Sequence, residues 1–220
     1  MIPMQRLIEG VHRFQRETFG NSLELFNRPS RNGQQPPTLL ITCADAGLLA
    51  ERISLNRPDG FHCATGLGTF IPPARATGGH DSIVATLEYA VRVLQVGDIV
   101  VCGHSPCGAM AALIHGLLAG TSQPHLAWWL ERVAPIQDLV RSRYAHLIND
   151  AERQHAAELE TVLLSLENLP THPCVQEQLN RGALHLHGWL FKTATGELFA
   201  YEPATGQFEP LMAFGEGRHT

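Results

Sequence analysis

Three side chains that bind soft metal ions occur where two short strands are expected to end. Cys43 closes the apolar run TLLITC, and His104 and Cys107 form a His-x-x-Cys spacing at the end of DIVVCGH. The His-x-x-Cys spacing forms a short loop that directs both side chains at one point. A cysteine from a neighbouring strand then supplies the third ligand. Two thiolates and an imidazole suit Zn²⁺ and not Mg²⁺ or Ca²⁺. We therefore predict a zinc site at Cys43, His104 and Cys107.

Asp45 stands two residues after Cys43. From that position its carboxylate reaches the same point as a fourth ligand, or stands just behind it. The spacing His-x-x-Cys beside a distant cysteine is often a coincidence. Its placement at strand ends in a strand–helix–strand pattern is what favours a metal site here.

The elements that must position these residues alternate along the chain. Short β-rich or alternating runs predict strands, and segments with helical spacing of apolar residues predict helices. The expected strands are 38–43, 60–64, 98–104, 183–191 and an edge strand within 197–203, and the expected helices are 5–19, 82–94, 107–120, 126–144 and 150–169. This order predicts an α/β fold with a mostly parallel sheet and helical crossovers.

Length and charge narrow the class of protein. The 220 residues suffice for one α/β domain, with an N-terminal helical arm and linker over 1–36 and a loose tail over 209–220. A formal charge of −5 offers no basic footprint for nucleic acid or anionic membranes. No run is apolar enough for a secretory signal or a membrane span. Five cysteines, an odd number, indicate reduced thiols or metal ligands, so we expect a cytoplasmic protein.

Two segments carry a specific resemblance. CADA at 43–46 and VVCGHSPCGAM at 100–110 resemble the Cys-x-Asp-x-Arg and Gly-His-x-x-Cys-Gly signatures of the β-carbonic anhydrases. MQRLIEG, NGQQPPTLLITC, IPP, LEYAVRVL and LHGWLF extend the likeness to cyanobacterial-type members, which include carboxysomal enzymes. The resemblance implies zinc on the three predicted ligands, a dimer as the minimal unit, and interconversion of CO₂ and bicarbonate. It also matches Gln34 to a glutamine that donates a hydrogen bond to bicarbonate.

The chain departs from the family at position 47, where Gly47 replaces the arginine of Cys-x-Asp-x-Arg. In the family, the planar fork of that arginine holds the aspartate away from the metal. Without the arginine, Asp45 has a free carboxylate close to a divalent cation. We expect Asp45 to become the fourth zinc ligand, which is the arrangement of a structural site and not of a catalytic one.

A second departure lies in the segment before IPP, where members resemble R-N-A-G-N. This chain has Thr65-Gly66-Leu67-Gly68-Thr69, preceded by His62 and Cys63 where aliphatic residues are usual. The metal ligands, Asp45 and Gln34 are kept while two arginines are lost. This selective loss indicates a new role for the protein, or zinc kept for folding.

Two functional interpretations follow from the resemblance and its departures. The first is a zinc lyase of weak activity, with Asp45 as the hydrogen-bond acceptor at the metal, Gln34 as the donor to bicarbonate, and Arg52, Arg57 or Arg75 in place of the missing arginine. The second is a non-catalytic relative. It would be a zinc-stabilised dimer or larger oligomer that serves as an assembly or regulatory partner of a carboxysome-like body or of an active paralogue.

The remaining cysteines and histidines receive ordinary interpretations. We expect Cys102 to be a small buried core residue, Cys63 to pack, and Cys174 to be inert in a turn. His185 and His187 share one face of a strand and form a possible chelating pair, but unliganded strand histidines are favoured. Asp81 or Ser82 is expected to cap the helix that follows.

Overall fold

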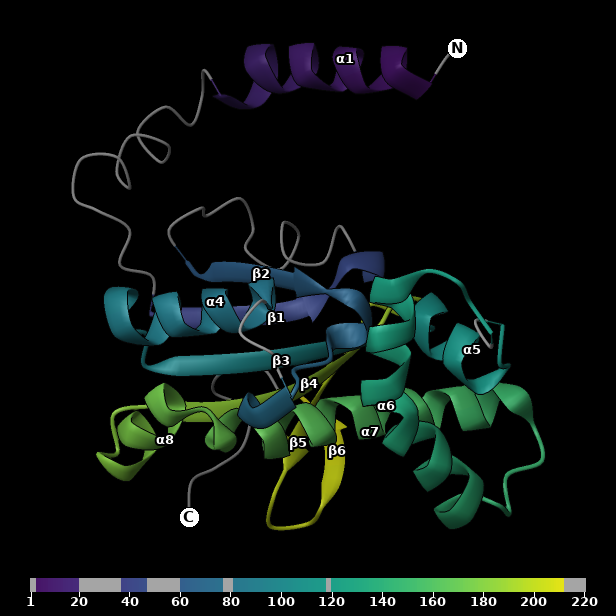
Figure 1. Ribbon diagram of the computed structural model, residues 1–220. Coiled ribbons are helices and arrows are strands. Elements are labelled where there is room, and N and C mark those ends of the chain that lie inside the picture. The colour runs from purple at the N-terminus through teal and green to yellow at the C-terminus, as the bar shows by residue number, and fades with distance from the viewer. Residues whose placement is uncertain (1–2, 20–36, 47–59, 77–80, 118–119, 212–220) are drawn as a thin grey trace.

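The computed structural model describes residues 3–19, 37–46, 60–76, 81–117 and 120–211. A six-stranded sheet forms its centre, in the order β2-β1-β3-β4-β5-β6 (Figure 1). The strands are β1 (Thr38–Cys43), β2 (His62–Gly66), β3 (Asp98–Ser105), β4 (His185–Lys192), β5 (Leu198–Glu202) and β6 (Gln207–Pro210). The first four are parallel neighbours, whereas β5 and β6 join by antiparallel pairing. The predicted α/β class and mostly parallel sheet are confirmed.

The helices pack beside this sheet. They are α1 (Pro3–Arg13), α4 (Ser82–Tyr89), α5 (Gly108–Ile114), α6 (Pro124–Arg143), α7 (Asp150–Asn168) and α8 (Pro173–Asn180). Wider helical turns continue α1 over Phe14–Phe19 and α4 over Ala90–Leu94. Asp81 caps α4 by accepting hydrogen bonds from the amides of Ile83 and Val84. Among the residues described, no helix is both long and apolar enough to cross a bilayer.

Several elements differ in extent from the sequence predictions. The helix predicted over 107–120 ends at Ile114, because Gly116 adopts a left-handed φ of 65° just after it. Strand β2 begins and ends two residues later than predicted. Strand β6 was not predicted, and it includes the first residues of the segment expected to be a loose tail.

The turn predicted around Cys174 is wrong. That residue is buried in α8, a helix of eight residues with a proline at its first position. Proline is favoured there because its missing N–H has no partner within the helix anyway. The helix is too short for its apolar spacing to stand out in the sequence.

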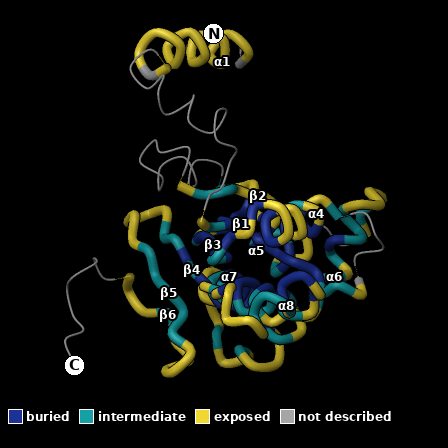
Figure 2. The backbone as a smooth tube through the Cα atoms, turned by 90° about the vertical axis from the view of Figure 1, so that its left-hand side faces the viewer, coloured by how far each residue is buried: buried dark blue, intermediate teal, exposed yellow. Residues whose placement is uncertain are grey.

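The core divides according to the faces of the sheet. On one face, Leu39 and Ile41 of β1 and Ile99 and Val101 of β3 pack with residues of α4, α7 and α8. The alternate residues Leu40, Val100 and Cys102 form a smaller cluster with residues of β4 and β5 on the other face. Cys102 is fully buried, as predicted. The buried central strands and the exposed α1 are visible in Figure 2.

A third apolar cluster lies at the carboxyl ends of β1 and β3. Residues of α5, α6 and α7 pack there against Cys43 and Cys107. The two central strands are almost wholly buried, which is the pattern of parallel strands covered on both faces. The fold therefore places the two predicted cysteine ligands in an apolar, water-poor setting.

Helix α7 approaches the sheet closely because two residues facing it are glycines. A Cβ atom on Gly103 of β3 would lie 2.7 Å from Cγ2 of Val162, and one on Gly188 of β4 would lie 2.7 Å from Cδ1 of Leu166. Two carbon atoms that are not bonded cannot approach so closely, so side chains of the helix occupy the space that a Cβ atom would need. This close packing brings the first half of α7 beside the end of β3.

We predict that Gly103→Ala lowers the free energy of unfolding by about 1–3 kcal/mol, because the added methyl group overpacks the contact with Val162. Urea denaturation measures the change. Gly10→Ala is the matched control, since a Cβ on Gly10 would meet nothing within 4 Å. Combining Gly103→Ala with Val162→Ala should cost less than the sum of the single changes. Strict additivity of the pair would contradict this packing argument.

Candidate metal centre

The carboxyl ends of β1 and β3 bring three potential ligands together. Cys43 is the last residue of β1, His104 lies near the end of β3, and Cys107 is the N-cap residue of α5. One ligand atom from each lies within 4.8 Å of the others, and the two Sγ atoms are 3.9 Å apart. All three residues are buried. Since β1 and β3 are adjacent parallel strands, their ends meet at one edge of the sheet.

The imidazole of His104 shows that this group fits a metal ion. Both of its ring nitrogens are buried, and neither has a hydrogen-bond partner among the residues that the structure describes. Buried polar atoms are nearly always satisfied, and an unmade bond costs about 1–3 kcal/mol. A cation held by one nitrogen and by the two nearby sulfurs would remove that cost for one of the two ring nitrogens.

The sulfur atoms are arranged to carry negative charge. The pKa of the Cys43 thiol falls to about 4, mainly because of its hydrogen bond with Cys107. Burial raises this pKa, whereas His104 and two backbone amides lower it further. Those amides belong to Gly68 and Asp45, whose nitrogens lie 3.2 and 3.4 Å from Sγ of Cys43. The Cys43 thiolate and burial raise the pKa of Cys107. Without a metal, the two sulfurs share one proton, and a divalent cation would replace it.

His104 responds to the same charges. Burial lowers its pKa, but the Cys43 thiolate and the carboxylates of Asp45 and Glu158 raise it, and the net direction is upward. The site therefore has an excess of negative charge when it holds no cation. Such a surplus favours the binding of a divalent cation.

The altered segment Thr65–Thr69 contributes directly to this centre. Gly68 donates its N–H to Cys43 and has a φ of 68°, which favours glycine. A Cβ there would also lie 2.7 Å from Cε of Met110 and 3.1 Å from Cζ2 of Trp129. Trp129 in turn donates its indole N–H to the carbonyl of Leu67. The sequence analysis noted the change in this segment but missed Gly68 as a residue that supports a ligand.

Asp45 lies beside the three-residue group and is held by a backbone amide. Its Oδ2 atom accepts a hydrogen bond of 2.8 Å from the N–H of Gly108, the first residue of α5. A Cβ on Gly108 would lie 2.9 Å from that oxygen, so the contact depends on glycine. The group of mutually close donor atoms among the described residues comprises Cys43, His104 and Cys107. A ligand role for Asp45 therefore stays a prediction.

Several predicted residues fall outside the described part of the chain. These residues are Gln34, Gly47, Arg52 and Arg57, and their predicted roles are untested. Arg75 is described and lies exposed in the short helical turn Ala74–Ala76.

The structure describes His185, His187 and Cys63, to which the sequence analysis gave ordinary interpretations. His185 and His187 direct ring nitrogens at Oδ1 of Asp98, at 3.8 and 2.8 Å, near the amino ends of β3 and β4. Asp98 begins β3, far along the strand from His104. The expectation that Cys63 packs is wrong for the described chain: Cys63 is exposed, because β2 is the edge strand of the sheet.

Known proteins are similar to this chain in sequence and in fold. Residues 38–198 match the protein family described as carbonic anhydrase. A carbonic anhydrase of Synechocystis sp. is 35% identical over 93% of this chain and 73% of its own length. A carbonic anhydrase of Pseudomonas aeruginosa is also 35% identical, over 98% of this chain and 95% of its own length.

Among solved structures, that of the β-carbonic anhydrase CcaA superposes with a TM-score of 0.87 at 33% identity, covering 94% of this chain and 99% of that one. The residues that match the carbonic anhydrase family, 38–198, span the buried Cys43–His104–Cys107 group. This chain therefore belongs to the β-carbonic anhydrase family.

Proposed function

We propose that the protein binds one Zn²⁺ through Cys43, His104 and Cys107, and that its CO₂ hydration activity is weak or absent. The observation that carries the zinc assignment is the buried His104 ring without a hydrogen-bond partner among the described residues, next to two sulfurs. The weak activity follows from Gly47, which offers no side chain where the family motif has a guanidinium. When bound, zinc supplies a Lewis acid for the hydration of CO₂.

The protein's own residues set the charge at this site. Two thiolates balance a divalent cation, so the three ligands leave it formally neutral. Amides of Gly68 and Asp45 stabilise the Cys43 sulfur, and the three ligand residues are buried. A cation held by them would attract the carboxylate of Asp45, which is exposed and therefore partly screened by water.

Asp45 is the candidate that the sequence motif gives, and we propose that it is the fourth ligand. Its backbone N–H is tied to the Cys43 sulfur, which places the residue beside the centre. The Gly108 amide engages only one of the two carboxylate oxygens, Oδ2. Without the arginine, this single neutral donor is weaker than the bidentate charged fork that holds the aspartate in the family.

We predict that Asp45→Asn lowers zinc affinity by at least about tenfold, because loss of a ligand exceeds the usual effect of changing a group behind the ligands. Competition with a chromophoric chelator measures the affinity. Asp81→Asn is the matched control. It makes the same Asp-to-Asn change at the helix cap of α4, where asparagine caps about as well as aspartate, so zinc affinity should be unchanged. Unchanged zinc binding by Asp45→Asn would show that Asp45 does not ligate the metal.

We predict that zinc-loaded native protein hydrates CO₂ at least about 10–100-fold more slowly than an arginine-containing relative, since the support of Asp45 is lost. Stopped-flow measurement with a pH indicator compares it with a β-carbonic anhydrase whose motif carries the arginine. Gly47→Arg should restore only part of the rate, because the Thr65–Thr69 segment also differs. A native rate equal to that of the relative would refute the proposal of weak activity.

The alternative is a non-catalytic protein that serves as an assembly or regulatory partner, of a carboxysome-like body or of an active paralogue. The observation that favours it is the retention of the whole ligand group beside the altered Thr65–Thr69 segment. In that role zinc would stabilise the fold. The stopped-flow comparison separates the two functions, since only the lyase turns over CO₂.

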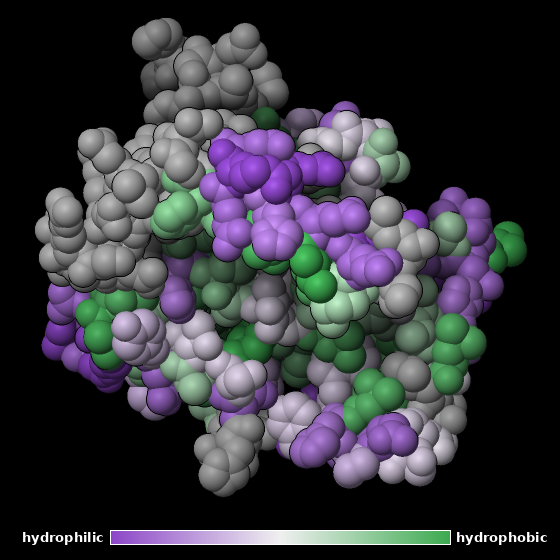
Figure 3. All heavy atoms as spheres, turned by 90° about the horizontal axis from the view of Figure 1, so that it is seen from above, coloured by the Kyte–Doolittle hydropathy of each residue, from purple (hydrophilic) through white to green (hydrophobic). Residues whose placement is uncertain are grey.

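We further propose that the protein forms a homodimer or larger oligomer through α1. Leu7, Ile8 and Val11 lie on this helix and are 62%, 47% and 47% exposed. Figure 3 views the molecule from the side on which α1 lies, where hydrophobic residues appear beside hydrophilic ones. Figure 1 shows α1 apart from the sheet and its helices. An amphipathic helix in this state gains stability by burying its apolar stripe in a partner.

We predict that the double variant Leu7→Glu/Val11→Glu shifts the protein to a smaller assembly, because charges replace the apolar contact. Light scattering coupled to gel filtration gives the mass. Arg6→Glu, on the same helix, is the control and should leave the assembly unchanged. A native protein that is already monomeric would refute the oligomer.

A further inference from the structure

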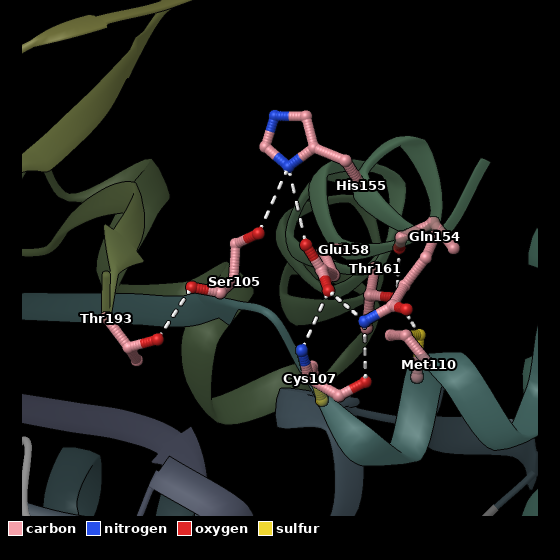
Figure 4. Close-up of polar contacts among 9 residues, drawn as sticks. Ser105, Cys107, Met110, Gln154, His155, Glu158, Thr161 and Thr193 are labelled. Carbon is pink, nitrogen blue, oxygen red and sulfur yellow. Dashed lines mark hydrogen bonds and ion pairs between the residues drawn. The ribbon is translucent and has the colours of Figure 1, made fainter. Parts of the chain in front are cut away.

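The first half of α7 contacts the segment from Ser105 to Cys107, which follows the proposed ligand His104 and ends in the proposed ligand Cys107. The amide of Cys107 donates to Oε1 of Glu158 at 2.8 Å, and Nε2 of Gln154 donates to the carbonyl of Cys107 at 3.2 Å. Nδ1 of His155 lies 3.4 Å from Oγ of Ser105 (Figure 4). Side chains of α7 thus contact both backbone polar groups of Cys107, whose carbonyl also accepts from the N–H of Ala111 in α5 at 3.0 Å. We call Gln154, His155 and Glu158 the α7 clamp.

The members of the clamp also bind one another. Gln154 donates to the same Oε1 atom of Glu158 at 2.9 Å, and Nδ1 of His155 lies 3.3 Å from Oε2. These side chains are spaced so that they lie on one face of the helix. Figure 4 shows them converging on the segment from Ser105 to Cys107. The loop and the helix therefore form one connected polar network.

Glu158 is an unusual residue for its surroundings. Its side chain is 1% exposed. Its carboxylate accepts hydrogen bonds from the Cys107 amide and from Gln154, and Nδ1 of His155 lies 3.3 Å from its other oxygen. A buried carboxylate is costly, and an apolar side chain would suit a core position better. Core packing therefore gives no reason for this carboxylate, whereas its contact with Cys107 does.

We propose that Glu158 is a positioning residue for the metal centre, which with Gln154 fixes the backbone of Cys107 and so presets its sulfur for the metal. The inference rests on the proposed zinc function. With its N–H and carbonyl both held, the backbone of Cys107 is fixed, and rotation about the Cα–Cβ bond is the main freedom left to its Sγ. A ligand that is ordered before binding loses less entropy when the metal arrives.

The test compares zinc affinity in variants of the full chain by chelator competition. Glu158→Leu removes the acceptor and should weaken zinc binding ~10–100-fold. Glu158→Gln keeps an oxygen for the Cys107 amide and should recover most of that loss. Absorption of the Co²⁺-loaded protein, which reports thiolate ligation, should be altered in Glu158→Leu and restored in Glu158→Gln.

Glu160 provides the matched control. It lies on the same helix and is buried, but its carboxylate accepts a hydrogen bond from the hydroxyl of Tyr144. Glu160→Leu should therefore reduce stability and leave zinc affinity and the Co²⁺ spectrum unchanged. A comparable fall in affinity in both leucine variants would mean that general destabilisation, and not positioning, is responsible, and it would overturn the inference.

The remaining outcomes are also decisive. If native protein binds one zinc and Glu158→Leu binds it equally well, the clamp has no positioning role and the proposed function stands. If native protein binds no zinc, both the positioning role and the proposed function fail.

Should Glu158→Leu not fold, Gln154→Ala carries the test. Gln154 is only partly buried, and its loss should weaken zinc binding roughly three- to tenfold by freeing the Cys107 carbonyl from α7. An unchanged affinity in Gln154→Ala would then overturn the inference.

Discussion

The parallel pairing of β1 with β3 is the constraint on which the metal centre depends. It aligns the ends of two strands that are separated by more than fifty residues, so that Cys43 meets the His104–Cys107 loop at one edge of the sheet. The helices then enclose that edge in an apolar cluster. Because water is scarce there, each buried charge or polar atom must find a partner within the protein or in a bound cation.

Negative charge accumulates at this edge, and backbone amides stabilise much of it. The thiolate of Cys43 accepts from Gly68 and Asp45, the carboxylate of Asp45 accepts from Gly108, and that of Glu158 accepts from Cys107. These donors are neutral, whereas the family motif uses an arginine beside the aspartate. The chain thus keeps the geometry that binds a cation while it loses the positive charge that restrains Asp45. This difference is the basis of the weak activity and of the fourth zinc ligand that we propose.

Much of the fold was predictable because buried parallel strands have a distinctive composition. TLLITC and DIVVCGH are short, apolar and rich in β-branched residues, and both form central strands. Helix α8 and strand β6 were missed, since each is too short for its periodicity to stand out. Exposure of Cys63 was missed for another reason. A strand's position at the edge of a sheet depends on which strands pair, and local sequence does not encode that order.

The sequence by itself determined the family, the three sulfur and imidazole donors, and the loss of the arginine at Gly47, because these depend on residue type and spacing. Only the tertiary structure decided which distant groups support those donors. Gly68 reaches Cys43 through a left-handed turn, and Glu158 reaches Cys107 through the close packing of α7 on Gly103. Neither contact leaves a local pattern, since hydrogen bonds between remote segments follow from how the layers pack.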